Sequence, residues 1–199
     1  MLKNNSDTVN NQHPDVGSLI PEFDINIFQN NKFGKKNISD WHGQWLVVFF
    51  YPADFTFVCP TELEELADHY SKFQALNTEI LSISTDTIYV HKAWHDTSPA
   101  IKKITFPMGA DPNGSISRNL GVYLENEGLA LRGTFIIDPE SKLVAYEVND
   151  NSIGRNVNEL LRKLQAAQYI REHPGEVCPA SWKPGAKTLT PNEDLVGKI

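Results

Sequence analysis

Residues 45–66 read WLVVFFYPADFTFVCPTELEEL, and this stretch contains the main signals for the fold. Its first seven residues, 45–51, are all apolar and rich in β-branched and aromatic side chains, which is typical of a strand buried on both faces. From Leu63 onward apolar residues recur at three- and four-residue spacing as far as Leu76, which predicts an amphipathic helix. A buried strand that leads through a short loop into such a helix predicts an α/β protein.

The flanking sequence extends this pattern in both directions. We predict strands at 23–28, 79–85, 134–138 and 143–148, helices at 88–94 and 157–167, a turn at 111–114 and a hairpin loop at 139–142. This order predicts a mixed sheet with helices on both faces.

The ends of the chain differ from its centre. Residues 1–13 are rich in Asn, Asp and Ser, so we expect a disordered segment there, followed by a domain over 14–169. Residues 170–199 lose the helical periodicity and contain four of the 12 prolines. We expect this segment to be an arm that lies over the domain or over a neighbouring subunit.

Composition limits the class of function. The formal net charge of the 199 residues is -7, which argues against a nucleic acid or an anionic membrane as the main partner. The longest apolar run, 45–51, is far shorter than the ~20 residues that span a bilayer. The first residues are polar and lack the apolar segment of a secretory signal, so we expect a cytoplasmic protein.

The chain has two cysteines, Cys59 and Cys178. In a reducing compartment disulfides tend to be transient and catalytic, and the wide spacing does not fit a zinc site. His91 and His95 could share a helical face, but with Trp94 between them we expect them to flank a packed aromatic ring. The cysteines could therefore be two buried bystanders, one reactive thiol or a redox pair, and we expect neither a metal nor a cofactor.

Cys59 directly precedes the predicted helix. Pro60 suits a first helical position, where its missing N–H would have no partner in the helix. Free N–H groups and the positive end of the helix dipole favour an anion at that place, and a thiolate is such an anion. The alternative is that Cys59 is a small buried apolar residue.

Several nearby polar residues could serve a reactive cysteine. The hydroxyl of Thr56 could orient a thiolate and an incoming O–H, or could simply belong to a turn. Arg132 is the best candidate for a permanent cation and Arg155 the second, although Arg132 could be a charge at the sheet edge and Arg155 a solvated charge. Glu62 could cap the helix or hold a cation, and Pro52 on its own indicates only a turn.

Pro52, Thr56 and Cys59 fit the motif P-x-x-x-T/S-x-x-C, and the segment around them resembles the typical two-cysteine peroxiredoxins, most of all the bacterial alkyl hydroperoxide reductase C proteins. Further segments resemble this family in the same order, namely 84–87, 91–95, 132–139, 173–182 and 194–199. The resemblance covers residues from about 20 to 199. It implies a thioredoxin-like mixed β-sheet flanked by helices, with an extended C-terminal arm.

The resemblance also implies a chemistry. Cys59 would be the peroxidatic cysteine, whose thiolate attacks a hydroperoxide and becomes a sulfenic acid. Pro52 would shield that intermediate, while Thr56 and Arg132 would bind the peroxide and stabilise charge as the O–O bond breaks. Glu62 and Arg155 match supporting positions of the family.

Cys178 matches the resolving cysteine, which in this family comes from the arm of the partner subunit. The resemblance implies a homodimer, often one of five in a decameric ring, and local unwinding before the disulfide can form. The chain has no C-x-x-C, so a flavoprotein disulfide reductase (the F component of the same peroxide-reducing system) or a thioredoxin would have to supply electrons.

Two other classes of function remain open from the residues alone. One is a redox-regulated chaperone or binding module on a thioredoxin-like scaffold, in which Cys59 is only structural. The other is a thiol–disulfide exchange enzyme, although such enzymes place both cysteines in one short loop.

Overall fold

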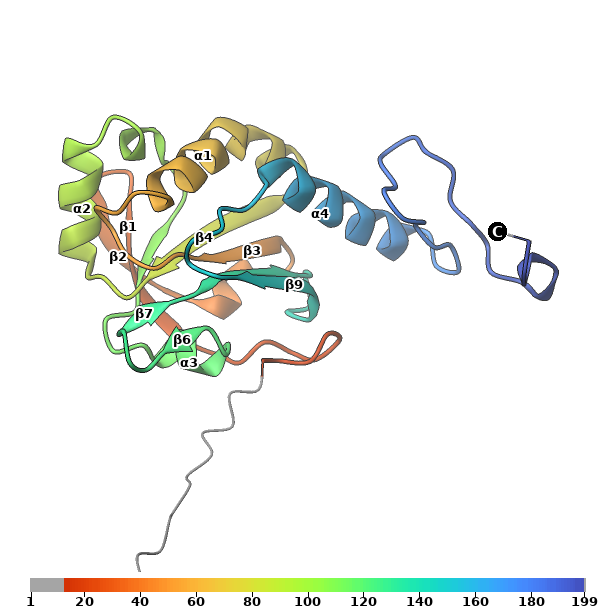
Figure 1. The fold of residues 1–199 in the computed structure, drawn as a ribbon, viewed down its shortest axis with the longest axis horizontal. Helices are drawn as coiled ribbons and strands as arrows, with labels where there is room; N and C mark the ends of the chain where they lie inside the picture. The colour runs from red at the N-terminus through yellow and green to blue at the C-terminus, as the bar shows by residue number, and fades with distance from the viewer. Residues whose placement is uncertain (1–12, 199) are drawn as a thin grey trace, which may run out of the picture.

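The computed structural model describes residues 13–198 and contains one seven-stranded sheet (Figure 1). The strand order is β2-β1-β5-β4-β3-β8-β9. The bounds are β1 Asp24–Gln29, β2 Lys32–Asn37, β3 Trp45–Phe50, β4 Thr78–Ser84, β5 Met108–Ala110, β8 Arg132–Ile137 and β9 Leu143–Asn149. β3 pairs with β4 in parallel and with β8 antiparallel, so the sheet is mixed, as the sequence predicts.

Every residue of β3 is buried because both faces of the sheet are covered. On one face, α1 (Cys59–Ala75), α2 (Ile88–Thr97) and α4 (Val157–Glu172) pack over a core that includes Val47, Phe49 and Leu63. On the other face the cover is thinner, with α3 (Ser115–Asn119), a 3-10 helix at Ile38–Trp41 and the small hairpin of β6 (Tyr123–Leu124) and β7 (Leu129–Ala130) (Figure 1). Helices therefore lie on both faces, as expected, but unequally.

Two strands, β2 and β5, are not predicted by the sequence pattern. β2 reads KFGKKN, is mostly exposed and lies at the end of the sheet, so it has no buried face to impose an alternation of apolar residues. β5 has only three residues, which is too short for a periodic signal. The predicted late helix is confirmed as α4, but it ends at Glu172 rather than near residue 167.

The segment predicted to be disordered, residues 1–13, lies outside the described residues except for His13. The Nδ1 of His13 donates to the carbonyl of Leu120 at 2.9 Å, and its ring stacks on Tyr146 with centroids 5.3 Å apart. The N-terminal end of the described chain is therefore packed on the domain at His13.

The last residues, 173–198, extend beyond the end of α4, outside the sheet and the elements that cover it (Figure 1). They are folded on themselves: Val177 pairs with Leu189 in an isolated bridge, and Trp182 is buried against Tyr169. A short 3-10 helix, Glu193–Leu195, lies near the end. The sequence predicts an arm over residues 170–199, but residues 170–172 belong to α4, and Cys178 lies in the segment that follows this helix.

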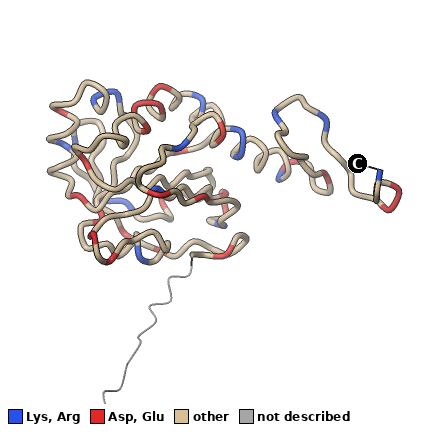
Figure 2. The backbone as a smooth tube through the Cα atoms, in the orientation of Figure 1, with Lys and Arg blue, Asp and Glu red and all other residues tan. Residues whose placement is uncertain are grey.

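Charged residues are distributed along residues 13–198, with basic and acidic residues interspersed (Figure 2). Within residues 13–198 no helix combines the length and the apolar character needed to cross a bilayer.

Candidate active site

Cys59 is the first residue of α1 and has no exposed surface. The loop that follows β3 brings it there, and Pro60 occupies the first turn of the helix, where no amide hydrogen is needed. Val58 contributes no side-chain cap to this helix end. The sulfur therefore lies at the positive end of the helix dipole, as the sequence predicts.

Arg132, the first residue of β8, is the cation that contacts the cysteine. Its Nη1 lies 3.4 Å from Cys59 Sγ and also donates to Oε2 of Glu62 at 2.7 Å. Its Nε and Nη2 both donate to the backbone carbonyl of Asn151, at 3.0 and 2.7 Å. The guanidinium is thus held at its end by a carboxylate and along one edge by a carbonyl, with one N–H aimed at the sulfur.

Glu62 lies one turn after the cysteine and binds the second predicted arginine. Nε and Nη2 of Arg155 donate to its two carboxylate oxygens at 2.9 and 3.0 Å, and the backbone N–H of Arg155 adds a bond of 2.8 Å. Nη1 of Arg155 donates to the carbonyl of Gly133 at 2.9 Å and to Oγ1 of Thr134 at 3.0 Å. The guanidinium also lies over the ring of Phe49, 3.3 Å from its centroid, so it is locked in place.

The charges of this cluster determine what it can do chemically. Arg132, Arg155 and Glu62 are all buried, and together they carry one net positive charge. Burial acts to raise the pKa of Glu62, but the hydrogen bonds and charges of Arg155 and Arg132 outweigh it and bring that pKa below its ordinary value. A thiolate on Cys59 makes the buried cluster neutral, which is the condition a low-dielectric site favours.

The other two motif residues lie on the loop before the helix. Pro52 is buried at the end of β3, and Thr56 is partly buried. The hydroxyl of Thr56 donates to the carbonyl of Ala53 at 2.9 Å, which leaves its oxygen able to accept from an incoming O–H. In this structure the hydroxyl of Thr56 therefore donates its hydrogen bond within the turn and not to the sulfur of Cys59.

A buried hydrogen-bond network, which the sequence pattern does not reveal, holds this loop through Asp54. Tyr51 Oη donates to Oδ1 of Asp54 at 2.7 Å, and His91 Nδ1 lies 2.7 Å from Oδ2. Burial raises the pKa of Asp54, and the partnership with His91 offsets part of that effect. His91 is thus a structural partner of the loop. Trp94 is buried against Tyr51, as expected for the aromatic ring between the two histidines.

Cys178 lies apart from this cluster, in the arm. Both cysteines are free thiols, and Cys178 is half-buried whereas Cys59 is fully buried. Desolvation and the charge of Glu176 raise the pKa of Cys178, while Arg162 acts in the opposite direction. The structure brings together Cys59, Arg132, Glu62 and Arg155, whereas Cys178 lies on the segment after α4 and is not part of this cluster.

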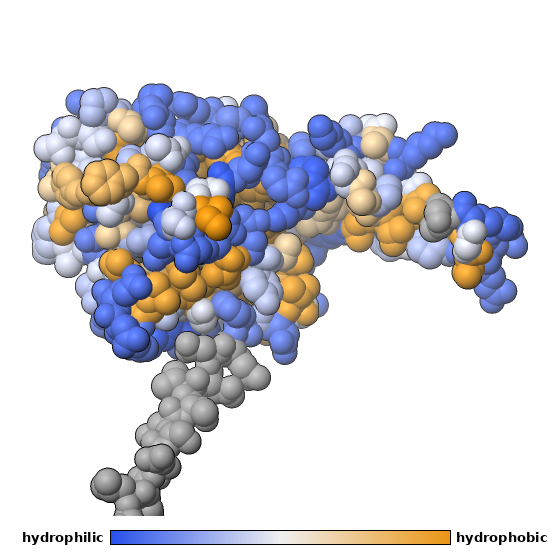
Figure 3. Space-filling model, in the orientation of Figure 1, coloured by the Kyte–Doolittle hydropathy of each residue, from blue (hydrophilic) through white to orange (hydrophobic). Residues whose placement is uncertain are grey.

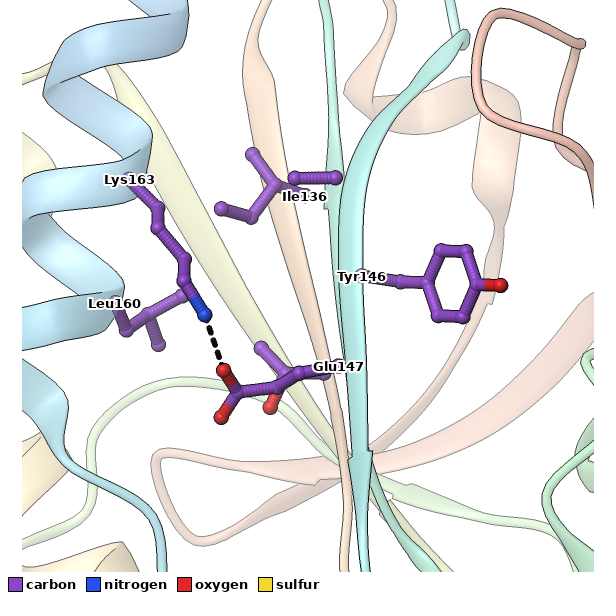
Figure 4. Close-up of a pocket in the computed structure, with 7 residues that line it drawn as sticks. Ile136, Tyr146, Glu147, Leu160 and Lys163 are labelled. Carbon is purple, nitrogen blue, oxygen red and sulfur yellow. Dashed lines mark hydrogen bonds and ion pairs between the residues drawn. The ribbon is translucent and has the colours of Figure 1, made fainter. Parts of the chain in front are cut away.

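A small pocket lies behind the cluster, between α4 and β9 (Figure 4). Its volume is about 10 Å³, room for about one water molecule, and Thr134 and Leu160 are among its lining residues. Glu147 and Lys163 form an ion pair at its edge, whereas Tyr146 points to the other side of the strand. Because it is so small and Cys59 does not line it, this pocket is not a binding site for a hydroperoxide.

The model of the AhpC/TSA family matches residues 16–146, about two thirds of the chain. The chain belongs to the AhpC/TSA family. A second model, described as the C-terminal domain of 1-Cys peroxiredoxin, matches residues 166–198 and so includes the segment around Cys178.

Individual relatives agree with this membership of the AhpC/TSA family. Alkyl hydroperoxide reductase C of Bacillus subtilis is 52% identical over 184 residues, 92% of this chain and 98% of the relative, and the protein of that name from Salmonella typhimurium is 51% identical over the same shares. The crystal structure of Enterococcus faecalis AhpC is 46% identical, covers 82% of this chain and 98% of its own, and has a TM-score of 0.80. Reduced Plasmodium vivax 2-Cys peroxiredoxin is 35% identical, with coverages of 90% and 94% and a TM-score of 0.86. The predicted peroxiredoxin fold, a thioredoxin-like mixed sheet, is confirmed.

Proposed function

We propose that Cys59 is the residue through which this chain reduces hydroperoxides. The chain is a thiol peroxidase of the peroxiredoxin type, as its 50–52% identical relatives named alkyl hydroperoxide reductase C indicate. The observation that supports Cys59 most directly is the contact between its sulfur and Nη1 of Arg132 at 3.4 Å. The alternative of a chaperone or binding module with a structural Cys59 is not favoured.

In the proposed first step, the Cys59 thiolate attacks the terminal oxygen of the hydroperoxide. An S–O bond forms as the O–O bond breaks, and the leaving oxygen takes a proton and departs as water or an alcohol. The peroxide is reduced by two electrons and Cys59 becomes a sulfenic acid. Arg132 stabilises the negative charge on the reacting atoms, Thr56 accepts from the peroxide O–H, and Pro52 shields the product from water.

Glu62 and Arg155 act in this proposal through Arg132 rather than on the substrate. Their bidentate pair, with distances of 2.9 and 3.0 Å, fixes the carboxylate that accepts from Arg132. A fixed guanidinium needs no reorganisation when charge develops at the sulfur and oxygen, which is the advantage of a preorganised site.

In the proposed second step, Cys178 of a second copy of the chain attacks the sulfenic acid, forms a disulfide with Cys59 and releases water. Because Cys59 is fully buried, the first turn of α1 must unwind locally for this to happen. The arm extends away from its own domain and exposes apolar residues such as Val196, which supports docking on another copy (Figure 3).

We also propose a homodimer as the working unit, assembled into rings of five dimers. β9 is the last strand of the sheet, and such a strand presents backbone groups that a second copy can pair with. Phe57, next to the active-site helix, is 92% exposed, and a large aromatic side chain with that degree of exposure suits a protein interface.

The disulfide must be reduced by another protein. We propose a peroxide substrate and a protein reductant, either a flavoprotein disulfide reductase (the F component of the system) or a thioredoxin, acting in the cytoplasm. Two free thiols and the lack of a C-x-x-C pair in the sequence support an external dithiol donor in a reducing compartment.

A single-turnover experiment tests this function. Fully reduced wild type, Cys59→Ser and Cys178→Ser are each mixed with one equivalent of cumene hydroperoxide, and the peroxide left is measured together with the intact mass. We expect wild type and Cys178→Ser to consume the peroxide, and Cys178→Ser to gain one oxygen. Consumption by Cys59→Ser at the wild-type rate would show that Cys59 is not the reacting residue.

A further inference from the structure

The orientation of Arg132 depends on a backbone carbonyl. Nε and Nη2 form one edge of the guanidinium, and both donate to the carbonyl oxygen of Asn151. Glu62 holds only the Nη1 end. With Glu62 alone the guanidinium could pivot about that end, so the carbonyl is what fixes the direction of the N–H that faces Cys59.

Asn151 lies in the loop between β9 and α4, where no helix or sheet bond sets the direction of its carbonyl. A local turn does so instead. Oδ1 of Asp150 accepts from the backbone N–H of Ser152 at 2.8 Å and from its Oγ at 2.5 Å. The backbone N–H of Ile153 closes the turn by donating to the carbonyl of Asp150 at 3.0 Å. Asn151 is enclosed between these bonds, so its peptide plane is fixed.

The chemistry of Asp150 suits this role. Its side-chain and backbone bonds with Ser152 bring the pKa of Asp150 below its ordinary value, with a smaller contribution from the charge of Arg132. The carboxylate is therefore a good acceptor at neutral pH and holds the turn. The same loop continues to Arg155, whose backbone N–H donates to Glu62, so a single segment sets the partners of both arginines.

We propose that Asp150 is a positioning residue for the peroxidase reaction. Its carboxylate shapes the turn that aims the carbonyl of Asn151 at Arg132, and this sets the contact of Arg132 with the sulfur of Cys59. Asp150 touches neither the sulfur nor the substrate. The inference rests on the proposed roles of Cys59 and Arg132.

The test uses the full chain in a Cys178→Ser background, so that Cys59 is the reporting thiol. Asp150→Ala removes the acceptor, Asp150→Asn keeps an acceptor oxygen but removes the charge, and Ser152→Ala removes one of the two donors. For each variant, the rate of alkylation by iodoacetamide is measured against pH, together with the second-order rate of oxidation by hydrogen peroxide. Thermal unfolding is recorded in parallel.

We expect Asp150→Ala to lower the peroxide rate about tenfold and to move the midpoint of the alkylation profile to higher pH, because a misaimed guanidinium contacts the thiolate less well. Asp150→Asn should stay within about twofold of the parent, and Ser152→Ala should lie between the two. An unchanged profile and rate in Asp150→Ala, or equal losses in Asp150→Asn and Asp150→Ala, would overturn the proposal. If Asp150→Ala does not fold, the other two variants still test the proposal. A peroxide rate that is lower in Ser152→Ala than in Asp150→Asn supports it, and the reverse order or equal rates would overturn it.

Arg132→Lys, measured in the same way, separates this inference from the proposed function. If Arg132→Lys leaves both readouts unchanged, the proposed role of Arg132 is wrong. If Arg132→Lys lowers the peroxide rate but Asp150→Ala does not, only the positioning role of Asp150 is wrong.

Discussion

The two cysteines lie in contrasting regions of the molecule. Cys59 is fully buried at a helix start, with Arg132 at its sulfur and Glu62 behind that arginine. Cys178 is half-buried on an arm outside the domain, where desolvation and Glu176 raise its pKa. One region is rigid and lined with fixed charges, which prepares a thiol for reaction in place. The other is attached at the end of α4, where Trp182 and Glu176 contact Tyr169, and this suits a thiol that has to be delivered to its target.

The largest expected effect separates the two thiols outright. Cys59→Ser should lose peroxide reduction by a factor of about 1,000 or more, down to the background rate, because the nucleophile is removed. Cys178→Ser should keep the rate of the first step and stop after one turnover. Stopped-flow loss of hydrogen peroxide, with reductant absent, gives both rates. Equal rates of peroxide loss for the two variants would show that Cys59 and Cys178 do not have different roles in the first step.

The next effect concerns the fixed charge. Arg132→Lys should lower the second-order rate with hydrogen peroxide about 100-fold, because the compact ammonium group lacks the planar fork with which the guanidinium spans Asn151, Glu62 and the sulfur. Arg171→Lys is the matched control, since Arg171 pairs with Glu140 on the surface. Similar rates for the two variants would show that the geometry at Arg132 does not contribute to the reaction.

Glu62→Gln tests whether the carboxylate of Glu62 balances the positive charges of Arg132 and Arg155 in the buried cluster. Two arginines would then share a buried site without a counter-charge, so we expect a loss of about 3 kcal/mol in the free energy of unfolding by urea. Glu125→Gln is the control, because its partner Arg118 is on the surface, and its effect should be much smaller. Equal losses would contradict the account of the cluster.

The same carboxylate gives a prediction about pH. Since the pKa of Glu62 lies below its ordinary value of 4.5 in the folded protein, its stabilisation is fully present above that value. It is lost as the pH falls through the lowered, folded-state pKa. Urea unfolding of wild type between about pH 3 and pH 6 should therefore show a steeper acid loss than Glu62→Gln. Parallel curves for the two proteins would mean that Glu62 is not the titrating group.

The smallest effect belongs to the arm. Trp182 is buried against Tyr169, and its Nε1 donates to the carbonyl of Ala186 at 3.1 Å, so it holds the arm in shape. Trp182→Ala should slow disulfide formation about threefold while the first step keeps its rate. Lys187→Ala, a change at an exposed polar residue of the arm, is the control. Quenched-flow gels without reductant measure the disulfide, and a slower first step would contradict the separation of the regions.

The sequence predicts the parts of the fold that have a strong period or a continuous apolar run. β3 and α1 are recognisable because both faces of the strand and one face of the helix are buried. β2 is exposed and β5 has three residues, so neither has a pattern to detect. The expectation for residues 1–13 concerns residues outside those the structure describes, except His13.

In the candidate site, too, only the residues that stand out in the sequence could be predicted. Cys59, Arg132 and Arg155 are unusual in their sequence surroundings and could be singled out as candidates. The acceptors that hold the arginines are backbone carbonyls of Asn151 and Gly133, and a carbonyl has no signature in sequence because every residue has one. The Asp54–His91 contact joins residues 37 positions apart, and only the fold shows it.

In the proposed mechanism, a thiol in the domain of one protomer is resolved by a thiol in the arm of another. Cys59→Ser and Cys178→Ser, carrying different tags, are co-expressed, reduced, and treated with one equivalent of hydrogen peroxide before non-reducing gel electrophoresis. We expect a disulfide-linked pair that contains one copy of each variant, because only such a pair combines an intact Cys59 with an intact Cys178. Absence of that mixed pair, together with a disulfide inside single wild-type chains, would contradict it.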